Sequence, residues 1–464
     1  MRVLFVFPPS VSAILNVLGT TAPPLGLAYL ASSLEEEGVD VRILDAQALG
    51  LSFSEIEQEI KRWRPDLVGA TGSTPACFDA LRVLEIAKKY GAKTVAGGPH
   101  FSFTDVETLE QYPFVDFVIR GEGERTMVEL ARALKENRKV LGILGLTHRN
   151  NGIIRRSQDR QLIEDIDNIP FPAFHLLPMK RYTFGDHNYS TVMTSRGCPY
   201  RCVFCASSKL FGKKWRGRSP KNVVEELELL TQKYHVRNIE FLDDTFTLDQ
   251  KRAERICDEI IERGLDIWWN CSSRVNTISP GLLEKMKKAG CTSIYYGVES
   301  GSQEILNRMK KGISLDQVVK VFEITKKVGM EIIGSFIIGF PGETINTIRK
   351  TIRFAKFLKP DYAQFTICTP YPGTELFEKI ENSEHMQLLT KNWKEYDALK
   401  PVYAINDGGF PSSSDLMRWV KKAYVNFYVS PGFLFQQLRK KRFIVWKKVL
   451  NAFKNYVKGN IRFG

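Results

Sequence analysis

Short apolar runs alternate with amphipathic stretches along the first 150 residues. Each apolar run is brief and rich in Val, Ile, Leu or Phe, as expected of a buried strand. The stretches 27–38 and 77–91 repeat apolar residues at helical spacing and end in glycine, a common residue at a helix C-terminus. Strands that alternate with helices predict an α/β domain with a doubly wound parallel sheet. The expected strands are 3–7, 41–45, 67–71, 93–97 and 117–121.

The loops that follow four of these strands are rich in Gly, Ser and Pro. They comprise residues 8–12, 72–75, 97–100 and 121–124. Ligands of doubly wound sheets bind beyond the carboxyl ends of the strands, so these loops are candidates for close approach to a large cofactor. For any single loop, glycines that only complete a tight turn are an equally good interpretation.

A polar, proline-containing stretch from Arg149 to Tyr189 precedes a second alternating region. Its helix 220–234 and six strands suit a partial, TIM-like (β/α)6 barrel, since eight repeats close a full one. The expected strands are 191–195, 237–244, 266–272, 293–299, 332–339 and 363–369. The predicted organisation is a Rossmann-like domain (1–150), a connector (151–190), a barrel (191–400) and a helical C-terminal extension (401–464).

The composition is that of a large globular protein. With 464 residues, 43% apolar and 25% charged, the chain is unlike disordered, collagenous or small disulfide-rich proteins. It has no run of about 18 apolar residues, and its first residues predict a strand instead of a signal peptide. We therefore expect a cytoplasmic protein, in which closely spaced cysteines are metal ligands or catalytic groups more often than disulfides.

The net charge of +14 is concentrated at one end of the chain. Residues 416–464 contain 12 Lys or Arg and no Asp or Glu, so the remainder is nearly neutral. A basic field confined to one terminus makes nucleic acid an unlikely partner.

Within this basic tail, apolar residues recur at helical spacing from Trp446 to Val457, and lysines occupy the opposite side. Such a helix suits the surface of an anionic membrane, which would make the protein peripheral on the inner face of that membrane. It suits equally well a helix that docks its apolar side on the barrel, and both interpretations stay open.

Cys198, Cys202 and Cys205 follow the first strand of the second region in a C-x3-C-x2-C arrangement. Three thiolates at this spacing can hold three irons of a 4Fe–4S cluster and leave the fourth iron open for a ligand. A zinc site is the alternative, but it needs a fourth Cys or His nearby. The other five cysteines are scattered singly, as is typical of small buried apolar residues. They are Cys77, Cys257, Cys271, Cys291 and Cys368.

This spacing, with the aromatic Phe204 before the third cysteine, resembles the radical SAM superfamily. The resemblance implies that the three cysteines hold a 4Fe–4S cluster whose open iron binds S-adenosylmethionine. Reduction of the cluster then cleaves S-adenosylmethionine to a 5′-deoxyadenosyl radical. The implied partner is a low-potential electron donor such as flavodoxin or ferredoxin.

Several downstream segments resemble the strand ends that contact S-adenosylmethionine in that family, namely FLDD, GVESG and IIGFPGET, and an arginine follows WWNCSS. For the acidic pair the alternative is helix N-capping, and for the Gly-Phe-Pro-Gly segment it is an ordinary turn. The residues implied to contact S-adenosylmethionine are Phe204, Asp243, Asp244, Arg274, Glu299, Ser300, Gly339, Pro341 and Gly342.

The N-terminal segments PPLGLAYLASSLEEEG, GGPH and GEGERTMVEL, followed by DNIPFPAF, resemble the cobalamin-binding domain and connector of the cobalamin-dependent radical SAM group. This group includes the anaerobic magnesium-protoporphyrin cyclase and hopanoid methylases. The implied cobalamin contacts are Ser73, Thr74, Gly97, Gly98, Pro99, His100, Gly121, Glu122, Gly123 and Glu124.

One departure concerns the cobalt ligand. The D-x-H-x-x-G loop, which donates a lower axial histidine in methionine-synthase-type domains, is absent from the sequence. We therefore expect that no protein histidine ligates the lower face of the cobalamin. His100 is expected to form a hydrogen bond within its turn instead.

The resemblance implies an enzyme that removes hydrogen from an unactivated C–H bond and methylates that carbon. The amphipathic basic tail indicates a small substrate that is lipid-like or hydrophobic. Radical cyclisation or C–C coupling without methyl transfer fits the sequence equally well. A protein of another class, which keeps the iron–sulfur cluster for binding or regulation without catalysis, is disfavoured by the retained strand-end residues.

Overall fold

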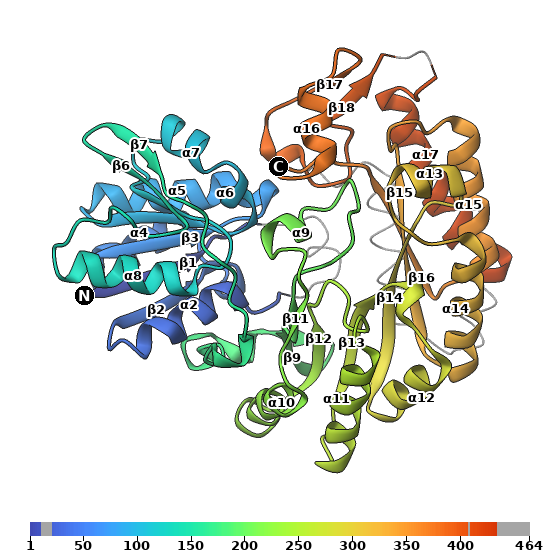
Figure 1. The fold of residues 1–464 in the computed structure, drawn as a ribbon, viewed down its shortest axis with the longest axis horizontal. Helices are drawn as coiled ribbons and strands as arrows, with labels where there is room; N and C mark the ends of the chain where they lie inside the picture. The colour runs from blue at the N-terminus through green and yellow to red at the C-terminus, as the bar shows by residue number, and fades with distance from the viewer. Residues whose placement is uncertain (11–20, 407–408, 434–464) are drawn as a thin grey trace. The chain divides into compact units, whose positions relative to one another are not determined.

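The computed structural model describes residues 1–10, 21–406 and 409–433 (Figure 1). These residues form two compact units. The first contains residues 1–10, 21–199 and 206–238, and the second contains residues 200–205, 239–406 and 409–433.

The first unit contains a seven-stranded sheet with flanking helices. Its strands are β1 (Arg2–Phe7), β2 (Asp40–Asp45), β3 (Leu67–Thr71), β4 (Lys93–Gly97), β5 (Phe117–Ile119), β6 (Leu146–Asn150) and β7 (Ile153–Arg156). The helices are α2 (Leu25–Glu35), α3 (Ala46–Leu49), α4 (Phe53–Trp63), α5 (Cys77–Lys89), α6 (Pro99–Phe103), α7 (Asp105–Gln111) and α8 (Glu124–Lys135).

The strand order is β2-β1-β3-β4-β5-β6-β7, and β1 to β5 pair in parallel. The chain moves one way along the sheet from β1 to β2 and the other way from β2 to β3 and β4. Because such crossovers are right-handed, α2 covers the face opposite to α4 and α5. The doubly wound parallel sheet predicted from the hydrophobic pattern is therefore confirmed.

The antiparallel hairpin β6–β7 extends this sheet beyond the strands that the pattern predicted. Its strands are largely polar and its outer strand is mostly exposed, so they carry no run of apolar residues. The turn between them is Asn151–Gly152, and both residues have positive φ, of 50° and 80°. Asn-Gly at such a two-residue turn is the common hairpin signal, and it was the missed clue to these strands.

The remaining elements of the first unit lead towards the barrel strands. They are β8 (Thr183–Phe184), β9 (His187–Val192), β10 (Ser195–Arg196), α9 (Ser207–Leu210), β11 (Arg216–Gly217), α10 (Pro220–Tyr234) and the start of β12 (Val236–Phe241). Helix α10 has the predicted bounds. The Ser219 hydroxyl caps it by accepting the N–H of Asn222, and proline opens its first turn.

The second unit contains most of the barrel strands. Its strands after β12 are β13 (Trp268–Ser273), β14 (Cys291–Glu299), β15 (Glu331–Ile338), β16 (Tyr362–Ile367), β17 (Met386–Leu388) and β18 (Tyr403–Ile405). Its helices are α11 (Gln250–Glu262), α12 (Pro280–Lys288), α13 (Gln303–Arg308), α14 (Leu315–Val328), α15 (Ile345–Leu358), α16 (Glu375–Glu381) and α17 (Ser413–Tyr428).

The barrel sheet has the order β16-β15-β14-β13-β12-β9-β8. Strands β13 to β16 pair in parallel, and each is followed by at least one helix. All six predicted barrel strands have a counterpart, and the sheet has two ends, as an open partial barrel requires. Strand β8 was not predicted from the sequence. It pairs antiparallel with β9 at the end of the sheet.

Helix α17 covers the free edge of β16. The Tyr424 hydroxyl accepts the N–H of Phe365 (3.2 Å) and donates to its carbonyl (3.1 Å). One helical turn later, Tyr428 makes the same two bonds with Ala363, at 3.1 and 2.9 Å. Residues 363 and 365 point their backbone groups to the same side of the strand, so two tyrosines in i, i+4 spacing satisfy four groups of an edge strand.

Replacement of Tyr424 and Tyr428 by phenylalanine is expected to lower the free energy of unfolding by about 1–3 kcal/mol for each tyrosine, because backbone groups lose their partners. Urea denaturation measures the change. Tyr90→Phe is the control, since the Tyr90 hydroxyl bonds Glu57 on the exposed surface, and it is expected to change stability by less than about 0.5 kcal/mol. Equal effects at the edge strand and at Tyr90 would contradict the proposed role of the two tyrosines.

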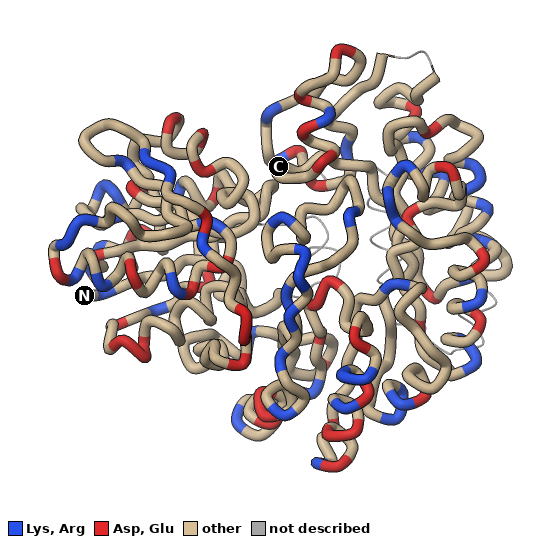
Figure 2. The backbone as a smooth tube through the Cα atoms, in the orientation of Figure 1, with Lys and Arg blue, Asp and Glu red and all other residues tan. Residues whose placement is uncertain are grey.

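The predicted C-terminal extension is helical where the structure describes it. Leu416, Trp419, Val420, Ala423 and Phe427 form the buried side of α17. The amphipathic stretch 446–457 lies outside the described residues. None of the described helices is both long enough and apolar enough to span a membrane. Figure 2 shows acidic and basic residues interspersed along the described chain, in keeping with the nearly neutral net charge of residues 1–415.

Candidate functional site

Three of the predicted cofactor loops in the first unit lie against one another at the carboxyl edge of its sheet. The backbone N–H of Gly72 donates to the carbonyl of Gly97, and that of His100 donates to the carbonyl of Gly72, both at 3.3 Å. The N–H of Gly121 donates to the Ser102 hydroxyl at 3.0 Å. These bonds connect the loops after β3, β4 and β5, where a ligand of a doubly wound sheet binds.

Gly98 permits this close packing. Its φ is +95°, and a Cβ atom at this position would lie 2.4 Å from the Thr71 hydroxyl. A larger residue would therefore force the loops after β3 and β4 apart. The other predicted cobalamin contacts differ in exposure, with Thr74 buried, Ser73 and Pro99 exposed, and Gly97, Gly121 and Gly123 half-buried.

His100 is buried in the short helix α6. Its ring packs against the ring of Phe101 in a T-shaped arrangement, with 5.3 Å between the ring centroids. Burial lowers the pKa of its imidazole to about 4. The side chain is therefore neutral at pH 7.

Glu122 and Glu124, also predicted to contact cobalamin, direct their carboxylates at two buried arginines. Glu122 pairs with Arg216 at 2.8 Å, and Glu124 pairs with Arg196 at 2.6 Å. All four side chains are buried. This pairing was not foreseen from the sequence, in which the partners are more than 70 residues apart.

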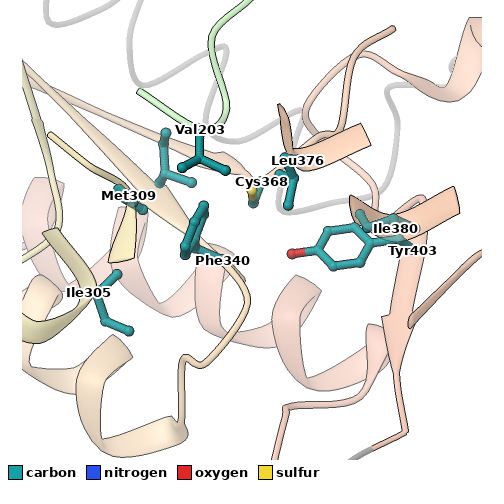
Figure 3. Packing of buried hydrophobic residues seen from close by; sticks show 9 residues of the cluster. Val203, Ile305, Met309, Phe340, Cys368, Leu376, Ile380 and Tyr403 are labelled. Carbon is teal, nitrogen blue, oxygen red and sulfur yellow. The ribbon is translucent and has the colours of Figure 1, made fainter. Parts of the chain in front are cut away.

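The part of the cysteine loop that belongs to the second unit, residues 200–205, is anchored at Val203. The N–H of Val203 donates to the carbonyl of Met309 (3.1 Å), and its carbonyl accepts the N–H of Leu376 (2.9 Å). Its side chain enters a buried apolar cluster with Phe340 and Leu376 (Figure 3). The partly buried ring of Phe204 packs against the same cluster. The backbone on either side of Val203 is thereby held in place.

The three cysteines of the loop differ from the other five in exposure. Cys198 and Cys202 are half-buried and Cys205 is exposed, whereas the others are buried, as predicted for scattered cysteines. Burial raises the pKa of the Cys257 and Cys368 thiols, which disfavours metal-binding thiolates there.

The loop offers an iron–sulfur cluster its three accessible sulfur ligands at a spacing of three and two residues. In the part of the chain that the structure describes, no three Cys, His, Asp or Glu side chains are grouped closely enough to hold a metal ion. The soft donor chemistry and accessibility of the loop sulfurs fit a cluster better than the buried thiols do.

Arg274, which follows β13, lies against the cysteine loop. Its guanidinium stacks on the Tyr200 ring at 3.6 Å and directs Nη1 at the Cys202 sulfur, also at 3.6 Å. A second nitrogen donates to the carbonyl of Lys311. The sequence predicted that Arg274 contacts S-adenosylmethionine. The structure adds a contact with a predicted cluster ligand, which places positive charge beside that sulfur.

Glu299 at the end of β14 forms a buried ion pair with Lys311, at 2.6 Å between Oε1 and Nζ. The pair lies over Gly297, where a Cβ atom would be 2.4 Å from the Glu299 carboxylate and 2.7 Å from the lysine. The Lys311 ammonium also lies 6.0 Å from the centre of the Phe204 ring. Lys311 was missed by the sequence analysis because one lysine in a lysine-rich turn carries no pattern.

The remaining predicted contacts lie at the carboxyl ends of the barrel strands but differ in environment. After β12, Asp243 is buried and Asp244 is exposed. After β14, Ser300 is fully buried, and its hydroxyl lies 3.2 Å from the hydroxyl of Thr351 in α15. Ser300 therefore has a structural contact within the unit.

The Gly-Phe-Pro-Gly segment after β15 is a turn held by a residue that the sequence analysis did not single out. Gly339 and Gly342 have φ of +88° and +89°, and Pro341 between them is half-buried. Oε2 of the Glu343 side chain accepts the N–H of Gly339 (2.6 Å) and of Phe340 (3.2 Å). Burial raises the pKa of Glu343 to about 8.

This shift predicts a pH dependence of stability. Between its ordinary pKa of 4.5 and about 8, the folded chain holds a proton on Glu343 that the unfolded chain has lost. Stability therefore falls as the pH rises through this range, by up to about 1.4 kcal/mol per pH unit. Glu343→Gln is expected to remove this contribution, and urea denaturation of both proteins from about pH 5 to pH 8 measures it. Identical slopes in the two proteins would contradict the shift.

Comparison with known proteins identifies two family profiles in the chain. Residues 192–355 match the Radical SAM superfamily and residues 11–131 match the B12 binding domain. An uncharacterised methyltransferase of Pyrococcus horikoshii is 47% identical, over 97% of this chain and 98% of that protein. The anaerobic magnesium-protoporphyrin IX monomethyl ester cyclase of Rubrivivax gelatinosus is 31% identical, over 94% of this chain and 78% of that protein.

Among solved structures, the radical S-adenosylmethionine methyltransferase TsrM of Kitasatospora setae, with cobalamin and a [4Fe–4S] cluster bound, superimposes with a TM-score of 0.75. The match covers 93% of this chain and 89% of that one, at 19% sequence identity, and supports the fold. The resemblances stated from the sequence motifs are therefore confirmed.

Proposed function

This chain belongs to the cobalamin-dependent radical SAM methyltransferase family, and we propose that it methylates an unactivated carbon of a small hydrophobic molecule. The observation that carries the proposal is the 47% identity to a methyltransferase along almost the whole of both chains. The cofactors of the family are a 4Fe–4S cluster, S-adenosylmethionine and cobalamin. When bound, they supply a 5′-deoxyadenosyl radical and a transferable methyl group.

In this proposal, Cys198, Cys202 and Cys205 hold the cluster. The backbone anchors of Val203 fix the segment that carries the second and third of these cysteines. The guanidinium of Arg274 directs an N–H at the sulfur of Cys202 and helps to orient this ligand.

The predicted S-adenosylmethionine contacts are supported by how firmly the barrel holds them. Lys311 pairs with Glu299 and orients its side chain at the end of β14. Glu343 holds the turn that contains Gly339 and Gly342 by accepting two backbone N–H groups. Preorganised groups of this kind bind a ligand without further loss of conformational freedom.

For cobalamin, the loops joined by Gly72, Gly98 and Gly121 are the proposed site. Their glycines let the backbone approach a large planar ligand closely. The neutral, buried His100 is proposed to support these loops and not to ligate cobalt.

A second candidate is radical cyclisation without methyl transfer. It is favoured by the 31% identity to a magnesium-protoporphyrin cyclase. The two functions differ in their by-products, since methyl transfer converts S-adenosylmethionine to S-adenosylhomocysteine and cyclisation does not.

The test uses the full-length protein reconstituted anaerobically with iron, sulfide and cobalamin and reduced by titanium citrate. The protein is given a lipid extract as the source of a hydrophobic substrate and S-adenosylmethionine with a deuterated methyl group, which labels the methylated product. We expect S-adenosylhomocysteine together with 5′-deoxyadenosine. Deoxyadenosine alone would favour cyclisation or coupling, and neither product would favour a non-catalytic iron–sulfur protein.

We also propose that a flavodoxin or ferredoxin supplies the electron and that the basic tail brings the enzyme to a membrane that holds a lipid-like substrate. The tail is supported by its charge, 12 Lys or Arg without Asp or Glu from residue 416 onward. Unchanged binding to anionic liposomes after deletion of residues 434–464 would contradict the membrane role.

A further inference from the structure

The cysteine loop is preceded and followed by a short ribbon whose two arginines face each other. Strands β10 and β11 pair antiparallel, with Arg196 opposite Arg216. The first strand of the ribbon ends at Gly197, which has a φ of +89°. The next residue, Cys198, donates its N–H to the carbonyl of Gly212 at 3.1 Å and so joins the two ends of the cysteine loop. Two neighbouring guanidinium groups repel each other unless anions lie between them.

Glu122 supplies that anion to both strands. Its two oxygens lie 2.8 and 3.0 Å from Nη1 of Arg216, and one of them lies 3.3 Å from Nη1 of Arg196. It also accepts the N–H of Ile163 at 2.8 Å. Glu124 pairs with the second nitrogen of Arg196 at 2.6 Å. The charges of the four side chains balance.

The network is buried, which makes its geometry demanding. The side chains of Glu122 and Arg216 are each 3% exposed, that of Arg196 is 6% exposed and that of Glu124 is 9% exposed. Removing one partner from such a network leaves a buried charge uncompensated. Arg216 further donates to the carbonyls of Ile163 (2.6 Å) and Phe211 (2.7 Å), so its position also sets the path of the loop.

We propose that Glu122 is a positioning residue for the iron–sulfur cluster, acting through Arg196 and Arg216 on the two strands at the base of the cysteine loop. This inference rests on the proposed function. Glu122 belongs to the Gly-Glu-Gly-Glu segment, which the sequence predicted to contact cobalamin. In this proposal its carboxylate instead helps to position the iron–sulfur cluster. The loop after β5 and the base of the cysteine loop then form one rigid body within the first unit.

The test compares Glu122→Gln with Asp105→Asn in the full-length, anaerobically reconstituted protein. Asp105 is the matched control, since it is a buried carboxylate of the same unit that pairs with Arg120 (3.4 Å) and Arg156 (3.0 Å) instead of the ribbon arginines. Three quantities are measured, namely iron release to a chelator, the electron paramagnetic resonance spectrum of the reduced cluster and the melting temperature.

For Glu122→Gln we expect iron to be held about 10- to 100-fold more weakly, the range typical of groups that orient metal ligands, with a changed spectrum. Asp105→Asn is expected to retain iron and to give the spectrum of the unaltered protein. Its melting temperature is expected to be similar to that of Glu122→Gln. Equal iron release in the two variants, or none beyond that of the unaltered protein, would overturn the proposal. Glu124→Gln removes one of the two carboxylate partners of Arg196 and leaves Arg216 paired. It is expected to be intermediate and serves if Glu122→Gln does not fold.

The outcomes also separate this inference from the proposed function. If the unaltered protein takes up no cluster, the proposed function fails. If it takes up a cluster that Glu122→Gln leaves unchanged, only the positioning role fails.

Discussion

Replacing Cys202 with alanine is expected to abolish cluster assembly and to reduce 5′-deoxyadenosine formation to background. Two thiolates would remain, fewer than the three needed to hold a cluster with one open iron. Cys202 is adjacent to the anchored Val203 and receives the Arg274 N–H, so its sulfur is the one of the three that the described fold holds most directly. Iron and sulfide content, followed by chromatography of the products, measures the effect.

Cys257→Ala is the control for this experiment. Cys257 is fully buried in α11, and its thiol has a raised pKa. Its replacement is expected to cost about 1 kcal/mol of stability and to leave the iron content unchanged. Normal iron content in the Cys202 variant would show that the loop does not hold the cluster.

Replacing Lys311 with methionine is expected to lower the free energy of unfolding by about 3–5 kcal/mol and to weaken S-adenosylmethionine binding. The methionine fills a similar volume, but it leaves the Glu299 carboxylate buried without its ion-pair partner. Glu299 also has a positive φ of 66°, so its backbone cannot relax freely away from the lost contact. Urea denaturation and equilibrium dialysis measure the two effects.

The neighbouring Lys310 provides a matched control. It pairs with Glu375 at 2.8 Å, but its side chain is 50% exposed. Lys310→Met is therefore expected to cost less than about 1 kcal/mol. Equal losses in the two variants would contradict the role of the buried pair. The double variant Glu299→Gln with Lys311→Met is expected to regain part of the stability, because no charge is left buried.

Much of the fold was predictable from the order of apolar residues. Helix α10 has the predicted bounds, and β3 and β4 match the expected strands residue for residue. The period of apolar residues reflects which side of an element faces the core, and this information is local. The hairpin β6–β7 was not predicted, because its largely polar strands carry no run of apolar residues. Its Asn151–Gly152 turn was the one local signal for it.

The candidate site was predictable in its chemistry more than in its contacts. The cysteine spacing predicted the cluster ligands, and the glycine-rich loops predicted a cofactor site. Both predictions were possible because the residues concerned lie a few positions apart in the sequence. Lys311, Val203 and Glu343 gave no such signal. Each acts through partners that the fold brings together, such as the carbonyl of Met309 for Val203.

The sequence by itself determined the two regions of alternating strands and helices, the three sulfur ligands and the confinement of excess charge to one terminus. Each of these depends only on the spacing or the composition of residues along the chain. Only the tertiary structure decided that Glu122 faces Arg196 and Arg216, and that Arg274 faces Cys202. Burial gives these pairings their strength, and burial depends on segments far apart in the chain. A charged residue can therefore be found in a sequence, but its partner is known only once the chain has folded.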